Sequence, residues 1–321
     1  MLHRIAAALL AAVPAVAATL LILQKSDHSL GFYDYDTLKL LARVPVNRYP
    51  HEFVVSPDTR FAYTADYGEP NVETAGRGGN TVSIVDLQQR KKVGEINLGK
   101  FRRPHGIAID RKGRVFVACE YDSELLALDP TTRTVLRRRP TGGQTTHMIA
   151  VTPDGNRVYA SHIRSGTVTA VDVWGNTPPL VVELEKRPEG IVLSKDGAHL
   201  FVANRESGSV SVIDTASLRV VNRIPVGEGP VRLYLTSDGR TLVVPLLEGR
   251  GVQLVSASQW RVVKEIRLPD RITGMGLSPD GRVGYFSAGF ADKVYEVSLT
   301  DGALRREIPT GKEPDPVYFL P

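Results

Sequence analysis

Apolar and polar residues alternate along most of this chain, and the alternation recurs as a longer unit. Residues 187–228, RPEGIVLSKDGAHLFVANRESGSVSVIDTASLRVVNRIPVGE, show one complete unit. It contains an apolar segment, a Lys-Asp-Gly turn, a second apolar segment, a Ser-Gly loop, a third segment with the letters VSVID, and a fourth. A two-residue period with β-branched apolar residues is typical of β-strands. Each unit therefore predicts four strands.

The turn glycines set the length of the unit. Successive members of this series lie 42 residues apart: Gly113, Gly155, Gly197, Gly239 and Gly281. So short a unit has no room for a helix crossing between parallel strands, and Asp-Gly turns join antiparallel neighbours. Radial stacking around a channel buries both faces of such four-stranded units. The sequence predicts an all-β fold, a β-propeller with four-stranded antiparallel blades.

Counting the first strand of each unit gives seven blades. The expected first strands are residues 51–55, 105–109, 147–151, 189–193, 231–235, 273–277 and 315–320. The last has no strands after it, but residues 19–46 align with the second, third and fourth strands of the unit at 199–226. We expect the C-terminal strand to join these N-terminal strands in one blade and close the ring.

The N-terminal segment predicts export. His3 and Arg4 precede an apolar run, and Ala15-Val16-Ala17 matches the small-residue pattern of a signal-peptidase site. Cleavage after Ala17 would release a periplasmic or secreted domain of residues 18–321. The alternative is a membrane anchor, because residues 5–23 carry no charge and a spanning helix needs about 20 residues. The strand expected from Thr19 favours the signal peptide and no transmembrane segment.

The repeats resemble a known family, the secreted YVTN-repeat (YncE-like) seven-bladed propellers, which are related to cytochrome-d1-like and lactonase-like propellers. The resemblance covers residues 19–321. It is carried by SPDG at 278–281, VANRESGSVSVIDT at 202–215, IPVGEGP at 224–230 and IPTGKEPD at 308–315. It implies the fold. Because the ring closes on itself, we expect the propeller to be a monomer. Function stays open, because propellers serve binding, scaffolding, hydrolysis, lyase and electron-transfer roles.

The first strands start at one mouth of the expected channel, so aligned residues form a ring there. Its members are His51, His105, His147, Glu189, Val231, Thr273 and Asp315. Three imidazoles between two carboxylates suit Zn²⁺ or a similar divalent ion. We therefore predict His51, His105, His147, Glu189 and Asp315 as metal ligands and His147 as a candidate general base. The alternative is that these histidines only hydrogen-bond neighbouring strand ends.

A second ring is expected where the second strands end. Its members are Gln24, Asp66, Glu120, His162, Asn204, Leu246 and Ala288. The polar members of both rings fall in the same arc of blades, which is typical of a ligand pocket. Asp66, Glu120, His162 and Asn204 are therefore predicted ligand contacts. Residues 66–80 form a loop ten residues longer than its counterpart in the unit at 187–228, and we interpret it as a lid or a tolerated insertion.

The distribution of charged residues predicts that the ligand is an anion. The chain has 40 Lys and Arg against 35 Asp and Glu, a net charge of +5. Several of the cations precede first strands and are predicted to bind the ligand: Arg48, Arg102, Arg103 and Arg187. The chain has no G-x-S-x-G, P-loop or C-x-x-C-H motif, and its single Cys119 cannot form an internal disulfide. Covalent haem attachment and P-loop nucleotide chemistry are excluded.

Three functions remain open from the sequence. The first is a binding or scaffold propeller that holds a small anionic ligand, a metal or a partner protein. The second is a metal-assisted enzyme of the lactonase or lyase type, in which His51, His105 or Glu189 holds the ion and His147 moves a proton. The third is binding of single-stranded nucleic acid, suggested by Tyr49, Tyr67 and Tyr121 near the same face.

Overall fold

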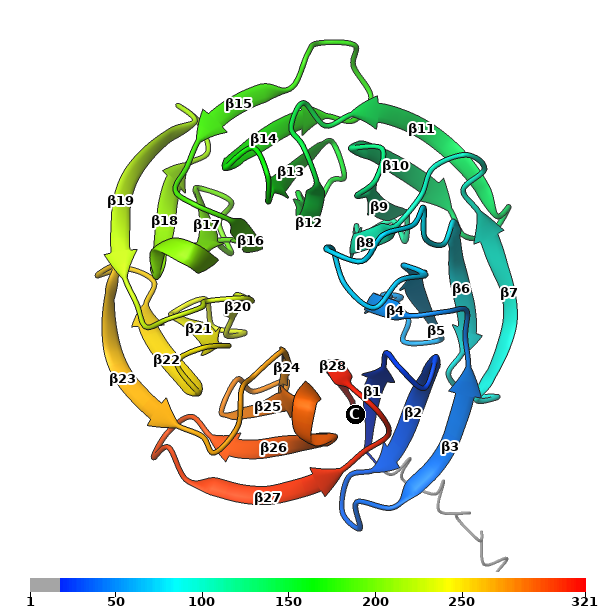
Figure 1. Ribbon diagram of the computed structural model, residues 1–321, viewed down its shortest axis with the longest axis vertical. Coiled ribbons are helices and arrows are strands. Elements are labelled where there is room, and N and C mark those ends of the chain that lie inside the picture. The colour runs from blue at the N-terminus through cyan, green and yellow to red at the C-terminus, as the bar shows by residue number, and fades with distance from the viewer. Residues whose placement is uncertain (1–17) are drawn as a thin grey trace, which may run out of the picture.

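Seven four-stranded antiparallel sheets surround a central channel (Figure 1). This computed structural model describes residues 18–321; the expected signal peptide, residues 1–17, lies outside the described residues. Helix is confined there to two single turns, η1 (Arg205–Ser207) and η2 (Gly289–Ala291). Over the described range, no helix is long and apolar enough to cross a bilayer. The predicted seven-bladed β-propeller is confirmed.

Each blade runs from an inner strand at the channel to an outer strand at the rim. Blades one and two contain β4 (Pro50–Val55), β5 (Phe61–Asp66), β6 (Thr81–Asp86), β7 (Lys91–Asn97), β8 (Pro104–Ile109), β9 (Val115–Cys119), β10 (Glu124–Asp129) and β11 (Thr134–Pro140). Blades three and four contain β12 (Thr146–Val151), β13 (Arg157–His162), β14 (Thr167–Asp172), β15 (Leu180–Glu183), β16 (Pro188–Leu193), β17 (His199–Asn204), β18 (Ser209–Asp214) and β19 (Arg219–Pro225). Blades five and six contain β20 (Tyr234–Leu235), β21 (Thr241–Leu246), β22 (Gly251–Ser256), β23 (Arg261–Arg267), β24 (Gly274–Leu277), β25 (Val283–Ala288), β26 (Lys293–Ser298) and β27 (Leu304–Pro309).

The seventh blade joins the two ends of the described chain, as predicted. It contains β28 (Pro314–Leu320), β1 (Thr19–Gln24), β2 (Ser29–Asp34) and β3 (Leu40–Pro45). β28 pairs with β1 antiparallel, with Thr19 opposite Leu320 and Ile22 opposite Val317. Closing the ring in this way leaves no unpaired inner strand between the first and last blades, and such a strand would be a site of aggregation.

The core lies between neighbouring blades. Strands such as β9 are buried on both faces, because each sheet is packed between two others, whereas the outer strand β19 alternates between exposed and less exposed positions. One apolar cluster, for example, joins Ile84 and Val82 of blade one to Val117 and Leu126 of blade two. This arrangement explains why the second strands of the blades are buried over almost their whole length and the outer strands alternate.

The inner turns confirm the glycine assignment and show one irregularity. The glycines of the 42-residue series all have positive φ, from 68° to 79°, a conformation that disfavours residues with a Cβ. The turn in blade three is closed by a hydrogen bond from the Thr152 amide to the Arg157 carbonyl, five residues on, but its counterpart in blade two joins Asp110 to Arg114. The turn of blade two is therefore one residue shorter, and β9 is displaced by one position against the repeat.

The first strand of blade five is much shorter than expected. Residues 231–235 were predicted as a strand, but β20 covers only Tyr234–Leu235, and Pro230 forms an isolated bridge with Leu246. Arg232 lies between this bridge and β20, and its buried side chain lies 2.5 Å from Glu52 of β4.

Candidate functional site

One mouth of the channel opens into a cavity of about 440 Å³, called here the channel cavity. All seven residues of the first predicted ring line it: His51, His105, His147, Glu189, Val231, Thr273 and Asp315. They meet there because each lies at the start of an inner strand, or one to three residues before it, and these strands run away from this mouth. The structure brings the ring together; the roles of its members as ligands or base stay predictions.

The three histidines of the channel cavity lie on adjacent blades and in contact. The ring centroids of His105 and His147 are 3.8 Å apart, and those of His51 and His105 are 5.0 Å apart. His51 uses Nε2 in a 3.1 Å hydrogen bond with the backbone carbonyl of Glu69. Burial lowers the pKa of both His51 and His105 well below 6.5. These two imidazoles are therefore neutral at physiological pH, the form that coordinates metals.

Glu120 completes a compact group with two of these histidines. His105, Glu120 and His147 each offer one donor atom, and the three atoms lie within 4.8 Å of one another; we call this group the metal cluster. The Nδ1 atom of His147 lies 3.0 Å from Oε2 of Glu120, and the Tyr67 hydroxyl donates to Oε1 at 2.7 Å. Nδ1 of His105 is buried without a hydrogen-bond partner in the described part of the chain. Such an orphaned nitrogen beside a carboxylate suits a bound cation.

The other two predicted metal ligands are engaged by cations. Glu189 accepts from Nε of Arg187 at 2.8 Å and from Nη1 of Arg205 at 3.2 Å. Burial acts to raise the pKa of Glu189, but His147 and the two arginines outweigh it and lower the value. Asp315 lies 3.2 Å from Nζ of Lys25. Both carboxylates line the channel cavity, but they are paired with cationic side chains and do not belong to the metal cluster.

A buried ion pair closes the inner end of the channel cavity. Arg232 lies 2.5 Å from Glu52 and 3.5 Å from Asp315, and all three side chains are almost fully buried. Burial raises the pKa of Glu52 from 4.5 to about 7, with Arg232 opposing the rise. Neither Glu52 nor Arg232 was predicted, because each follows a ring residue by one position and their contact joins blades one and five.

Most side chains of the second predicted ring bond to other strands of their own blade and do not line the channel cavity. Asp66 accepts hydrogen bonds from Thr81 and Ser83. His162 binds the hydroxyls of Thr146 and Thr169. Burial raises the pKa of Asp66 to about 6 and lowers that of His162 to about 4. These side chains tie strands together within a blade.

Asn204 is used in the same way as the other members of this ring. Its amide donates to the hydroxyls of Ser209 and Ser211, also within one blade. Ligand contacts were predicted for Asp66, His162 and Asn204, whereas the structure places none of them on the lining of the channel cavity. The alternation of side chains along a strand explains this, since these three lie at the last position of the second strand, on the sheet face where they bond to hydroxyls of the third strand.

Glu120 escaped this pattern because of the shortened turn in blade two. One missing residue makes Cys119, not Glu120, the equivalent of His162, and the Cys119 side chain is buried in the core between blades one and two. Glu120 instead corresponds to Tyr67 and Ile163. The amides of all three donate to the residue before a first strand: Tyr49, Arg103 and Thr145. A residue-by-residue alignment of the turns, in place of a fixed 42-residue spacing, would have found the true second ring, which includes Lys25, Tyr67, Glu120, Ile163, Arg205 and Leu247.

The long loop between β5 and β6 reaches over the channel cavity (Figure 1). Pro70, Asn71, Val72 and Glu73 line the cavity from above. Arg103 anchors the loop from below, because its buried guanidinium donates to the carbonyls of residues 72, 74 and 76. The loop therefore forms a roof, as expected for a rim element.

The predicted arginines divide by position. Arg187 lines the channel cavity. Arg103 instead donates its guanidinium hydrogen bonds to the roof loop and is not available to a ligand. Arg48 is exposed, lies against the ring of Tyr49, and lines a separate depression with Asp66. Arg102 donates its backbone amide to Asp122 and does not line the channel cavity. Of the four, the geometry supports only Arg187 as a contact for an anion in this cavity.

The tyrosines offer little to a nucleic acid strand. Tyr67 is fully buried and bonded to Glu120, and Tyr49 packs edge-on against His28. Tyr121 is exposed. A stacking surface for successive bases needs several accessible rings, and the predicted trio does not form one.

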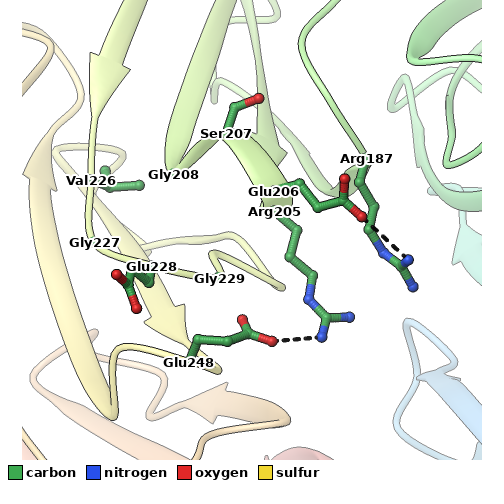
Figure 2. Close-up of a pocket in the computed structure, with 10 residues that line it drawn as sticks. All are labelled: Arg187, Arg205, Glu206, Ser207, Gly208, Val226, Gly227, Glu228, Gly229 and Glu248. Carbon is green, nitrogen blue, oxygen red and sulfur yellow. Dashed lines mark hydrogen bonds and ion pairs between the residues drawn. The ribbon is translucent and has the colours of Figure 1, made fainter.

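A second, wider pocket adjoins the channel cavity between blades four and five. It has a volume of about 700 Å³, and Figure 2 shows its lining: Arg187, Arg205, Glu206, Ser207, Gly208, Val226, Gly227, Glu228, Gly229 and Glu248. We call it the outer pocket. Arg187 and Arg205 line both spaces and form the wall between them.

Comparison with known proteins supports the fold and no more specific class. No family model matches the chain. No curated protein matches it either. The resemblance to YVTN-repeat propellers therefore stays a prediction.

Several solved structures share the architecture. A hydrazine synthase chain of Kuenenia stuttgartiensis is 22% identical with a TM-score of 0.73, over 88% of this chain and 92% of that one. A periplasmic gluconolactonase of Pseudomonas aeruginosa is 16% identical with a TM-score of 0.76, over 95% and 99%. The dihydro-heme d1 dehydrogenase NirN, in complex with DHE, is 16% identical with a TM-score of 0.65, over 94% and 74%. The shared feature is the propeller fold. At these identities the likeness shows the fold alone.

Proposed function

We propose that this propeller is an exported, monomeric binding protein that holds a first-row divalent metal ion, such as zinc, at His105, Glu120 and His147, and takes a small anionic ligand beside it. The observation that carries the proposal is the metal cluster itself: three buried donor atoms within 4.8 Å at the mouth of one cavity.

The donor set suits zinc. Two imidazoles and one carboxylate are ligands that Zn²⁺ accepts, and a three-ligand site leaves one coordination position open. Tyr67 donates to Glu120 and thereby orients the carboxylate, as partners behind metal ligands commonly do. His105 and His147 line the channel cavity, where Arg187 and Arg205 supply positive charge. A bound cation and two guanidinium groups together favour an anionic ligand.

Zinc binding by purified residues 18–321 tests the proposal. After treatment with a chelator, calorimetric titration with zinc is expected to show one bound ion per chain. His105→Ala is expected to weaken zinc binding by at least about 100-fold, since loss of a partner behind a ligand already costs 10- to 100-fold. The matched control is His162→Gln, which changes a buried histidine outside the cluster and should leave affinity within about threefold. Equal zinc affinity in wild-type protein and His105→Ala would refute the site.

Export rests on the N-terminal sequence and on one neighbour. The segment before Ala18 has the features of a signal peptide. The similar gluconolactonase is periplasmic by its name. Both agree with a propeller that works outside the cytoplasm.

His51 favours a second candidate function, a metal-assisted lactonase or lyase. Its imidazole stands outside the metal cluster, 5.0 Å from the His105 ring centroid, and burial keeps it neutral. A neutral base beside a Lewis-acidic ion is the arrangement that proton transfer next to a polarised carbonyl requires. If His147 ligates the ion, it is not free to act as the general base, and His51 takes that role in its place. Turnover of a lactone by the zinc-loaded protein would distinguish this candidate from simple binding.

A further inference from the structure

Arg187 and Arg205 form a paired cationic wall that the metal cluster does not use. Both guanidinium groups meet at the buried carboxylate of Glu189, at 2.8 and 3.2 Å. Both also line the channel cavity and the outer pocket. The two arginines therefore stand where a ligand could reach them from either space.

Their remaining ion-pair partners are carboxylates that are more exposed than Glu189, namely Glu73, Glu206 and Glu248. Nη1 of Arg187 lies 3.5 Å from Glu73 and 3.6 Å from Glu206, whose side chains are 63% and 56% exposed. Figure 2 shows Glu206 turned toward Arg187 and Glu248 toward Arg205. Exposed ion pairs of this kind contribute at most about 1 kcal/mol, because water competes for both charges. A ligand anion can therefore displace Glu73 at small cost.

We propose that Arg187 and Arg205 are a clamp for a monocarboxylate ligand of the channel cavity, and that Glu73 of the roof loop occupies this clamp when the ligand is absent. This inference rests on the proposed function, because it names the class of the anion that the cavity takes. It adds Arg205 to the binding residues and makes Glu73 an internal competitor of the ligand.

Charge and shape favour a carboxylate. A ligand carboxylate that replaces Glu73 leaves the charge around the two guanidinium groups unchanged, whereas a phosphate dianion adds a further negative charge beside Glu189, Glu206 and Glu248. The planar fork of Arg pairs with two carboxylate oxygens at once.

The roof loop allows the exchange without unfolding. Arg103 binds the carbonyls of Val72 and Thr74, on either side of Glu73. The backbone next to Glu73 is therefore held in place while its exposed side chain is free to turn away. Glu73 is therefore the carboxylate that the entering ligand replaces.

Titration of the zinc-loaded protein with lactate, a small monocarboxylate, tests the clamp, with inorganic phosphate as the comparison anion. Glu73→Gln is expected to tighten lactate binding about two- to fivefold, the equivalent of an exposed ion pair removed. Arg187→Met and Arg205→Met are each expected to weaken it at least about tenfold, the loss of a charge-assisted hydrogen bond. The matched control is Glu69→Gln, which alters the same loop outside the clamp's ion pairs.

The outcomes separate this inference from the proposed function. Lactate affinity unchanged in Arg187→Met, or changed equally by Glu73→Gln and Glu69→Gln, would overturn the clamp while zinc and anion binding stand. Tighter binding of phosphate than of lactate would overturn the monocarboxylate assignment. If neither anion binds to wild-type protein or Glu73→Gln, the anionic part of the proposed function fails as well, and the zinc titration reports on the metal cluster independently.

Discussion

Deletion of residues 315–321 is expected to abolish cooperative folding of the propeller. The deletion removes nearly all of β28, the inner strand that pairs with β1 and closes the ring. It uncovers the β1 residues Leu20, Leu21, Ile22 and Leu23, none of which is exposed in the intact protein. Total domain stability is about 5–15 kcal/mol, and burying each large aliphatic side chain contributes about 1.5–3 kcal/mol. Loss of contacts around several of them is sufficient to unfold the domain.

Near-ultraviolet circular dichroism and thermal denaturation measure this effect. The truncated protein should lack a cooperative transition and should aggregate through the exposed edge of β1. The matched control is removal of Pro321 alone, which is exposed and leaves the Thr19–Leu320 pairing intact. A truncated protein with a transition near that of the control would show that the ring closes without β28.

Replacing Arg232 by Met is expected to destabilise the protein by about 3–5 kcal/mol at pH 8, because the change leaves a buried carboxylate without its partner. Arg232 serves two buried acids, Glu52 at 2.5 Å and Asp315 at 3.5 Å. Chemical denaturation of wild-type and variant proteins measures the difference in the free energy of unfolding. Equal stability at pH 8 would contradict a paired, ionised Arg232.

The loss should shrink as the pH falls. The pKa of Glu52 is raised by burial to about 7 in the folded protein, above its ordinary 4.5. The folded state therefore takes up a proton that the unfolded state lacks between these values, and the stability due to this group is greatest below 4.5 and lost as the pH rises through 7. In Arg232→Met the protonated Glu52 carries no unpaired charge, so the variant is expected to be less impaired at pH 5 than at pH 8.

A double variant controls for the size of the side chain. Glu52→Gln combined with Arg232→Met removes both charges of the shortest pair and should recover part of the lost stability at pH 8. Recovery would assign the effect to the buried charge. The same loss in the single and double variants would assign it to packing.

Local pattern was enough to predict most of this fold. Alternating apolar residues, turn glycines with positive φ and the alignment of residues 19–46 with a complete blade led to seven blades, the antiparallel strand order and the ring closure, all confirmed. The first ring at the channel mouth followed from the same alignment, since each member holds an equivalent place in its strand.

The position of Glu120 in the site depends on the length of one turn, which differs by a single residue from the other blades. A constant 42-residue period placed Glu120 with Asp66 and His162, but the turn of blade two is one residue shorter. Neighbouring positions in a strand face opposite sides. The shift by one residue therefore places Glu120 in the metal cluster, whereas Asp66 and His162 bond to side chains of their own blades. The alternation of apolar residues does not reveal such a shift, because a turn that is one residue longer or shorter leaves the alternation within each strand unchanged.

By itself, the sequence determined the architecture, because each propeller blade forms from short-range strand pairing and the same unit recurs along the chain. Only the tertiary structure decided which polar side chains share the channel. Glu52 and Arg232 are 180 residues apart, and Glu73 reaches Arg187 from another blade. Contacts of this kind arise when distant blades converge on one axis, and the distances between their side chains depend on the closed ring, which no local pattern encodes.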